Sequence, residues 1–181
     1  LNYEVITTYS DLLSITNELS ACSLTAFFTQ TLSFPVSVGW GIGHTLQEAR
    51  ENAVQANNQR VNTKESYAHI LTKDEKLIGP LGTDSFLIVS NQYDGRLDSL
   101  GEELGMAPLQ LQRVMAVMDK LQSNELSADD ISAHLNITLR TASRILKKLE
   151  DHGIATVSYN KQKKMKGRPK KIYKIQLYER T

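Results

Sequence analysis

The stretch from Ser127 to Gly153 constrains this chain most, because residues that begin, turn and end helices follow one another at fixed intervals. Ser127 and Asp130 form a capping-box pair, and Thr138 is typical of a second N-cap. Asn136 suits the left-handed residue of a tight turn, and Gly153 suits the left-handed residue that follows a helix. The spacing therefore predicts helices over residues 129–135 and 139–152, joined as a helix-turn-helix.

The second of these helices is predicted to have two faces, one apolar and one polar. The polar side chains near its N-terminal end match the part of a recognition helix that enters the major groove of DNA. There Arg bonds guanine bidentately and Thr contacts a base edge or methyl group. Lysines farther along the helix are expected to contact phosphates. When this helix is considered without the rest of the chain, the alternative is a polar face that is only exposed to solvent. The apolar stripe is Ala142, Ile145, Leu146 and Leu149; the major-groove residues are Arg140, Thr141 and Arg144; the phosphate lysines are Lys147 and Lys148; Thr138 and Ser143 complete the predicted contacts.

A strongly basic loop, residues 160–171, follows this helix between two predicted strands, 154–159 and 172–178. A β-hairpin in this position is a wing. The extended Gly167-Arg168-Pro169 presents one Arg in a way that suits a narrow minor groove, whose negative potential attracts Arg. Helix and hairpin together predict binding to nucleic acid, and a hairpin used for protein contacts is the alternative. The six lysines and one arginine of the loop are Lys161, Lys163, Lys164, Lys166, Arg168, Lys170 and Lys171.

The formal charge is distributed unevenly, although it sums to only +1 over the chain. Residues 1–100 hold six basic and eleven acidic side chains, a net charge of −5. Residues 101–181 hold 15 basic and nine acidic side chains, a net charge of +6. This asymmetry favours a polyanionic partner for the C-terminal part alone.

Residues 107–178 resemble bacterial and archaeal winged-helix transcription regulators. The resemblance rests on Leu126–Ile131, on Thr141–Gly153, and on the Gly-Arg-Pro…Tyr pattern of Gly167–Tyr173. It implies binding to double-stranded DNA, and also a homodimer, because operators are usually read by two-fold symmetric dimers. Residues 110–122 are the expected dimerisation or transmission helix.

The sequence pattern of the predicted helix-turn-helix matches that of the segment 31 residues before it. Leu100, Leu104 and Met106 correspond to Ile131, Leu135 and Ile137, and Gly105 corresponds to Asn136 at the turn. The match is either an internal repeat of helix, turn and helix or a coincidence of helical periodicity.

The sequence pattern of the first half of the chain predicts an α+β arrangement in which helices pack on a sheet. The expected strands are 2–9, 34–42, 67–71, 76–79 and 86–90; the expected helices are 11–32, whole or broken in two, and 45–62. A glycine-rich strand end leads into a helix N-terminus, where exposed amides can hold an anion. This suggests ligand contacts at Gly41, Gly43, His44 and Thr45. The alternative is that the glycines let the helix pack close to the sheet.

Residues 2–79 resemble part of nucleotidyl-cyclase-like domains, the GGDEF-type palm and the related archaeal GTP cyclohydrolase. The shared feature is the Ser37-x-Gly39-x-Gly41 strand followed by an Ala-rich helix. The resemblance implies a partial ferredoxin-like, cyclase-like sensory fold. The catalytic carboxylates of those enzymes would precede Leu1, so we expect a truncated domain with no catalytic residues and no enzymatic activity.

Several chemistries find no support in the residues. His44, His69, His134 and His152 are scattered without ligand spacing, so neither a metal site nor a cofactor is expected. The single Cys22 excludes an internal disulfide and suits the cytoplasm, and no apolar run is long enough to predict a membrane span.

The combined prediction is an α+β chain in three parts: a sensory and dimerisation domain at 1–90, connecting helices at 91–123, and a winged helix-turn-helix at 124–181. The predicted function is sequence-specific transcription regulation by a dimer that responds to a small-molecule or nucleotide effector. Two alternatives stay open. One is a cyclase-like or GTP-hydrolysing enzyme fused to a DNA-binding module, and the other is a winged-helix interaction adaptor that binds protein or RNA.

Overall fold

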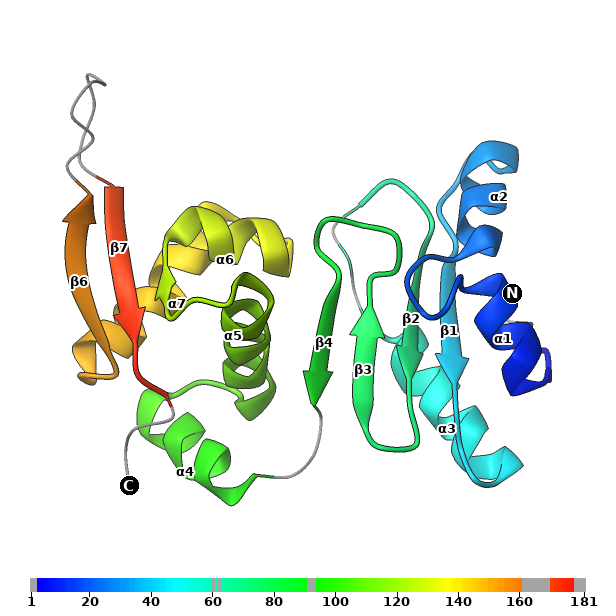
Figure 1. Cartoon of the computed structure of the whole chain (residues 1–181), viewed down its shortest axis with the longest axis horizontal. Helices are drawn as coiled ribbons and strands as arrows, with labels where there is room; N and C mark the ends of the chain where they lie inside the picture. Colours follow the sequence, from blue (N-terminus) through cyan, green and yellow to red (C-terminus); the bar gives the residue numbers. More distant parts are fainter. Residues whose placement is uncertain (1–2, 60, 62, 91–93, 161–169, 178–181) are drawn as a thin grey trace. The chain divides into compact units, whose positions relative to one another are not determined.

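A computed structural model describes residues 3–59, 61, 63–90, 94–160 and 170–177. Over these residues the chain is mixed α+β, with seven helices and two sheets (Figure 1), as the sequence predicts at that level. Two compact units, 1–92 and 93–181, divide it. None of the helices in the described ranges is long and apolar enough to cross a membrane.

The first unit is built on a four-stranded sheet in the order β1-β2-β3-β4. β1 and β2 run parallel, as a strand–helix–strand crossover requires, and the other neighbours run antiparallel. The predicted hairpin at 67–71 and 76–79 is confirmed. The strands are β1 Ser37–Gly41, β2 Tyr67–Leu71, β3 Lys76–Gly79 and β4 Leu87–Ser90.

Three helices complete this unit: α1 Tyr9–Ile15, α2 Ser23–Thr31 and α3 Leu46–Asn57. The pattern over 11–32 thus forms two helices, and the predicted helix over 45–62 ends at Asn57. One cluster joins Ile15, Leu19, Cys22 and Leu24 to Val38, Trp40, Ala68, Ile70 and Ile78 of the sheet. The strand register places these sheet residues on one face, so α1, α2 and their connection cover that face and α3 lies against the other.

The predicted strand at 2–9 is wrong over the residues that the structure describes. Residues 3–8 have no regular secondary structure and are exposed. The chain becomes helical at Tyr9, because the Thr8 side chain accepts a hydrogen bond from the Asp11 amide (3.2 Å) and caps α1. β-Branched composition alone does not form a strand where no neighbouring strand pairs with it.

The second unit contains four helices and a three-stranded antiparallel sheet in the order β5-β7-β6. Its fully buried apolar residues include Leu111, Leu126, Ile131, Leu149 and Ile175, drawn from both layers. The elements are α4 Gly95–Leu104, α5 Pro108–Leu121, β5 Glu125–Leu126, α6 Ala128–Leu135, α7 Leu139–Asp151, β6 Ala155–Asn160 and β7 Lys170–Ile175.

Residues 94–123 belong to this second unit and do not form a separate connector. Leu111, Val114 and Val117 of α5 have no exposed surface. Their spacing places them on one side of the helix, so α5 is a core helix. Because the apolar side of α5 packs into the core of the unit, the structure gives no support to the dimerisation role predicted for residues 110–122.

The offset of 31 residues relates two turns of the same backbone geometry. Gly105 ends α4 at φ 57° and ψ 44°, and Asn136 ends α6 at φ 50° and ψ 46°. The same hydrogen bond closes each turn, from the Met106 amide to the Gly101 carbonyl at 2.8 Å and from the Ile137 amide to the Ser132 carbonyl at 3.2 Å. The second unit therefore contains two successive helix-turn-helix pairs.

Candidate nucleic-acid interface

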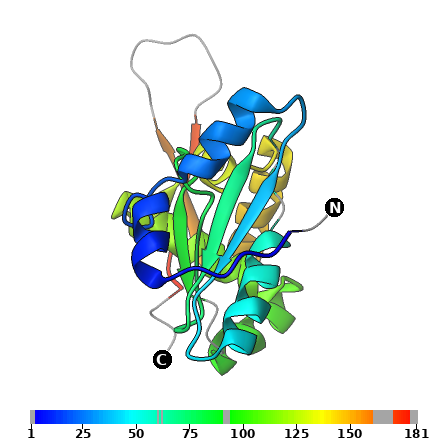
Figure 2. The same ribbon diagram turned by 90° about the vertical axis from the view of Figure 1, so that its right-hand side faces the viewer.

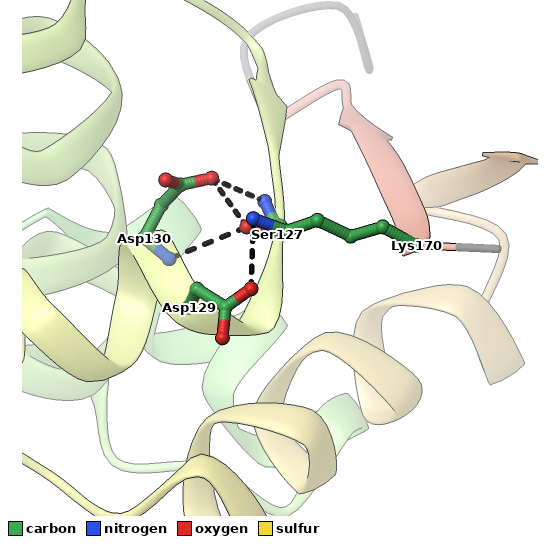
Figure 3. Close-up of polar contacts among 4 residues, drawn as sticks. All are labelled: Ser127, Asp129, Asp130 and Lys170. Atoms are coloured by element: carbon green, nitrogen blue, oxygen red, sulfur yellow. Dashed lines mark hydrogen bonds and ion pairs between the residues drawn. The ribbon is translucent and has the colours of Figure 1, made fainter. Parts of the chain in front are cut away.

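The start of α6 has the predicted capping box. The Ser127 hydroxyl oxygen accepts a hydrogen bond from the Asp130 amide at 3.3 Å. One carboxylate oxygen of Asp130 accepts from the Ser127 amide at 2.8 Å and from its hydroxyl at 2.6 Å (Figure 3). Burial raises the pKa of Asp130, but these hydrogen bonds and the nearby charge of Lys170 outweigh burial and lower it overall. Asp130 is therefore a charged cap at neutral pH.

This cap predicts a specific sensitivity to acid. A carboxyl group with a lowered folded-state pKa stabilises the fold above its unfolded pKa, about 4, and loses that contribution as the pH falls through the folded value. We expect the free energy of unfolding, measured by denaturant titration with circular dichroism, to fall below pH about 4 less steeply in Asp130→Asn than in the wild type. The control Asp151→Asn, at an exposed position of α7, should keep the wild-type slope. Equal slopes in all three proteins would contradict this role of Asp130.

The turn before α7 is also built as predicted. Asn136 adopts the left-handed conformation. Thr138 is the N-cap of α7, since its hydroxyl oxygen accepts from the Thr141 amide at 3.2 Å. The two threonine hydroxyl oxygens lie 3.0 Å apart and share a hydrogen bond. Both threonines, predicted to contact DNA, thus already have a structural role at the start of the helix.

The two predicted faces of α7 are present. Ala142, Ile145, Leu146 and Leu149 are each at most 3% exposed. Arg140, Arg144 and Lys147 are all exposed, and so is Ser143. Residues at three- and four-residue intervals share a helix face, so these three cations project together from the side opposite the buried stripe. Asp151 follows on the same face and ends the run of positive charge.

Lys148 differs from the other cations of α7. It is only half-buried, and its Nζ donates a hydrogen bond to the Gly105 carbonyl oxygen at 2.6 Å. That carbonyl belongs to the turn between α4 and α5. Lys148, predicted to meet phosphate, therefore connects two helix pairs within the unit.

Lys170 likewise has an internal partner. Its Nζ lies 2.7 Å from a carboxylate oxygen of Asp129, at the start of α6 (Figure 3). The hydrogen bond to Asp129 raises the pKa of Lys170, against a smaller effect of burial. Lys171 is exposed, with its Nζ 6.0 Å from the ring centre of Tyr173, at the limit of a cation–π contact.

The remaining predicted wing contacts, Lys161, Lys163, Lys164, Lys166 and Arg168, lie outside the described residues. The strands on either side of them are paired, with Asn160 opposite Lys170 at the loop end. The β6–β7 hairpin thus brings the two ends of the basic loop together.

The exposure of one apolar residue of α7 was not predicted from the sequence. Leu139, the first residue of α7, is 52% exposed. Its spacing from Ala142 and Leu146 is that of the buried stripe, so periodicity assigns it to the core. It is exposed because it lies in the first turn, beyond the core that covers the rest of the stripe. By that spacing Leu139 lies toward the buried stripe and not on the face of Arg140, Arg144 and Lys147.

The ligand contacts predicted in the first unit have another explanation. A Cβ atom added at Gly39 or Gly41 would overlap the backbone of α3, at the Ala53 and Ala49 carbonyl oxygens respectively. The glycines of β1 therefore allow close packing of helix on strand, as the alternative interpretation of the sequence holds.

The N-terminus of α3 already has an acidic partner. Glu48 accepts a hydrogen bond from the His44 amide at 2.7 Å, and Thr45 caps the Glu48 amide at 3.1 Å. An added Cβ at Gly43 would lie 2.5 Å from the Ala49 amide nitrogen. The anion site predicted at Gly41, Gly43, His44 and Thr45 thus contains a carboxylate of the chain itself, and close packing accounts for its glycines.

Among the described residues, no three His, Cys, Asp or Glu side chains come together as a possible metal site. Cys22 is buried, with a free thiol. No protein-family model matches the chain, and no curated protein or solved structure with which it was compared matches it either.

Proposed function

We propose that the chain is a sequence-specific regulator of transcription that binds double-stranded DNA as a homodimer. In this proposal the second unit is a winged helix-turn-helix, with α7 as the recognition helix and the β6–β7 hairpin as the wing. The order α5-β5-α6-α7-β6-β7, with the sheet order β5-β7-β6, supports the assignment. The first unit would supply dimerisation and the response to a small-molecule or nucleotide effector.

The observation that supports DNA binding most directly is the exposed face of α7. Arg140 and Arg144 lie one turn apart on it, with side chains that can each bond guanine bidentately in the major groove. Lys147, one turn farther on, can meet a phosphate. The buried stripe on the opposite side holds the helix against the core, so the cations project from a rigid element.

The basic loop adds a second cationic element to the same unit. Five of its cations lie between the paired ends of β6 and β7. A polyanion offsets their mutual repulsion, and each phosphate neutralised releases counterions. In this proposal Arg168 enters a minor groove and the lysines contact the flanking phosphates.

The proposal predicts a steep dependence of DNA affinity on salt concentration. The logarithm of the association constant falls with the logarithm of salt by about 0.9 per phosphate contact. Fluorescence anisotropy of a labelled duplex should therefore give a slope flatter by about 2 in Lys164→Ala/Arg168→Ala. The control Lys73→Ala/Lys76→Ala removes the same charge from the first unit and should keep the wild-type slope. A wild-type affinity that does not change with salt would contradict the proposal.

A further inference from the structure

The outward face of α3 is an open groove of about 880 Å³, lined by Leu46, Gln47, Arg50, Glu51, Val54 and Gln55. Leu46 and Val54 are 62% and 51% exposed, although the helix already packs its small residues against β1 on the other side. The outward face therefore presents two exposed apolar residues beside a cation, an anion and two amides.

The segment 3–8 extends this surface. The Arg50 Nε lies 3.0 Å from a carboxylate oxygen of Glu4, which holds the segment beside α3. Figure 2 shows the segment crossing the first unit past β1 and α3. Tyr3, Val5 and Ile6 are each more than 75% exposed. We call α3 and residues 3–6 together the α3 surface.

The two charged residues that α3 presents in this groove are self-complementary. A two-fold axis perpendicular to α3, between Arg50 and Glu51, places a second copy of the helix antiparallel to the first. Position 50 of one copy then faces position 51 of the other, and likewise 47 faces 54 and 46 faces 55. A cation then faces an anion twice, while Val54 faces the partner's Gln47 and Leu46 faces the partner's Gln55. A two-fold interface needs this property, since each patch must fit a copy of itself.

We propose that the α3 surface binds a second copy of this chain, with the two α3 helices antiparallel about a two-fold axis. Arg50 then faces the partner's Glu51, and Glu51 faces the partner's Arg50. Two twelve-residue helices bury less than the roughly 800 Å² per partner of a standard interface. The exposed side chains of residues 3–6 supply further area beside the helix. The inference locates the dimer interface in the first unit, and it stands whether or not the second unit binds DNA.

The first test is the mass of the full chain without DNA, measured by sedimentation equilibrium at micromolar concentrations. We expect a dimer in the wild type. Val54→Glu should raise the dimer dissociation constant by at least about 30-fold, because it places an unpaired charge within the interface, one turn from the two-fold axis and opposite the partner's Gln47. The matched control Phe34→Glu changes another exposed residue of the same unit, 61% exposed and outside the groove. It should leave the constant unchanged. A monomeric wild type would overturn the inference.

Charge reversal tests the two-fold geometry itself. Arg50→Glu and Glu51→Arg should each weaken the dimer, because each puts like charges opposite one another. The double variant Arg50→Glu/Glu51→Arg should recover most of the affinity, although it also lacks the contact between Arg50 and Glu4. A double variant as weak as the singles, with a wild-type circular dichroism spectrum, would overturn the antiparallel pairing. Because these measurements contain no DNA, their failure is distinguishable from failure of the proposed function.

Discussion

Replacing Arg140 and Arg144 together by alanine should lower the affinity for a selected DNA site by about 30- to 20,000-fold, since each bidentate contact to guanine contributes about 1–3 kcal/mol of discrimination. Both side chains are exposed on the face of α7 opposite the core. The variant should therefore keep the wild-type unfolding transition while it loses sequence-specific binding.

The measurement uses duplexes selected from random sequence by the wild-type protein, with a scrambled duplex for comparison. Loss of base contacts lowers affinity for the selected duplex much more than for the scrambled one. Lys147→Ala should instead weaken both duplexes equally, as expected for a phosphate contact. Arg96→Ala is the matched control, because its side chain is 90% exposed in the same unit but lies on α4. If the double variant bound the selected duplex as the wild type does, α7 would not be the recognition helix.

The helix boundaries of the second unit were predictable because single residues determine them locally. Ser127, Thr138 and Asn136 act through hydrogen bonds or dihedral angles within a few positions of themselves. Gly153 has the positive φ of 70° that a left-handed residue after a helix requires. β5 was not predictable, because two residues have no periodicity. It exists only through its pairing with β7, where Leu126 lies opposite Tyr173.

The composition of the candidate interface was partly predictable. The cationic face of α7 follows from helical spacing, and the structure presents Arg140, Arg144 and Lys147 together. The contact of Lys148 spans 43 residues, to the Gly105 carbonyl, and the ion pair of Lys170 reaches back to Asp129. Such contacts depend on packing between elements, and local patterns contain no information about them.

In the first unit, local patterns predicted the hairpin but not the irregular conformation of residues 3–8. Strand formation needs a partner at the right distance, and the Thr8 cap of α1 begins a helix directly after this segment. From the sequence, the glycines of β1 could be interpreted either as part of a ligand site or as a means of close helix packing. Only the position of the α3 backbone decides between these, since it fills the space that a Cβ would need.

That close approach also sets the largest loss of stability expected here. Gly41→Ala should destabilise the first unit by about 3 kcal/mol, at the upper end of the cost of overpacking. The atom that the new methyl group would meet is the Ala49 carbonyl oxygen in the first turn of α3. Because the obstacle is backbone, no rotamer change relieves it, and α3 must move away from β1.

Trp40 reports this change directly, because it is the only tryptophan in the chain and precedes Gly41 on β1. Thermal unfolding followed by its fluorescence should shift to lower temperature in Gly41→Ala. Ser37→Ala, on the same strand, should leave the transition near its wild-type midpoint. Movement of α3 also displaces Arg50 and Val54, so the variant should weaken the dimer proposed on the α3 surface below its own unfolding temperature. Binding of one half-site by the second unit, a separate compact unit, should be unchanged at that temperature. A Gly41→Ala protein with wild-type unfolding would mean that β1 and α3 have room to separate, and the packing explanation for these glycines would be lost.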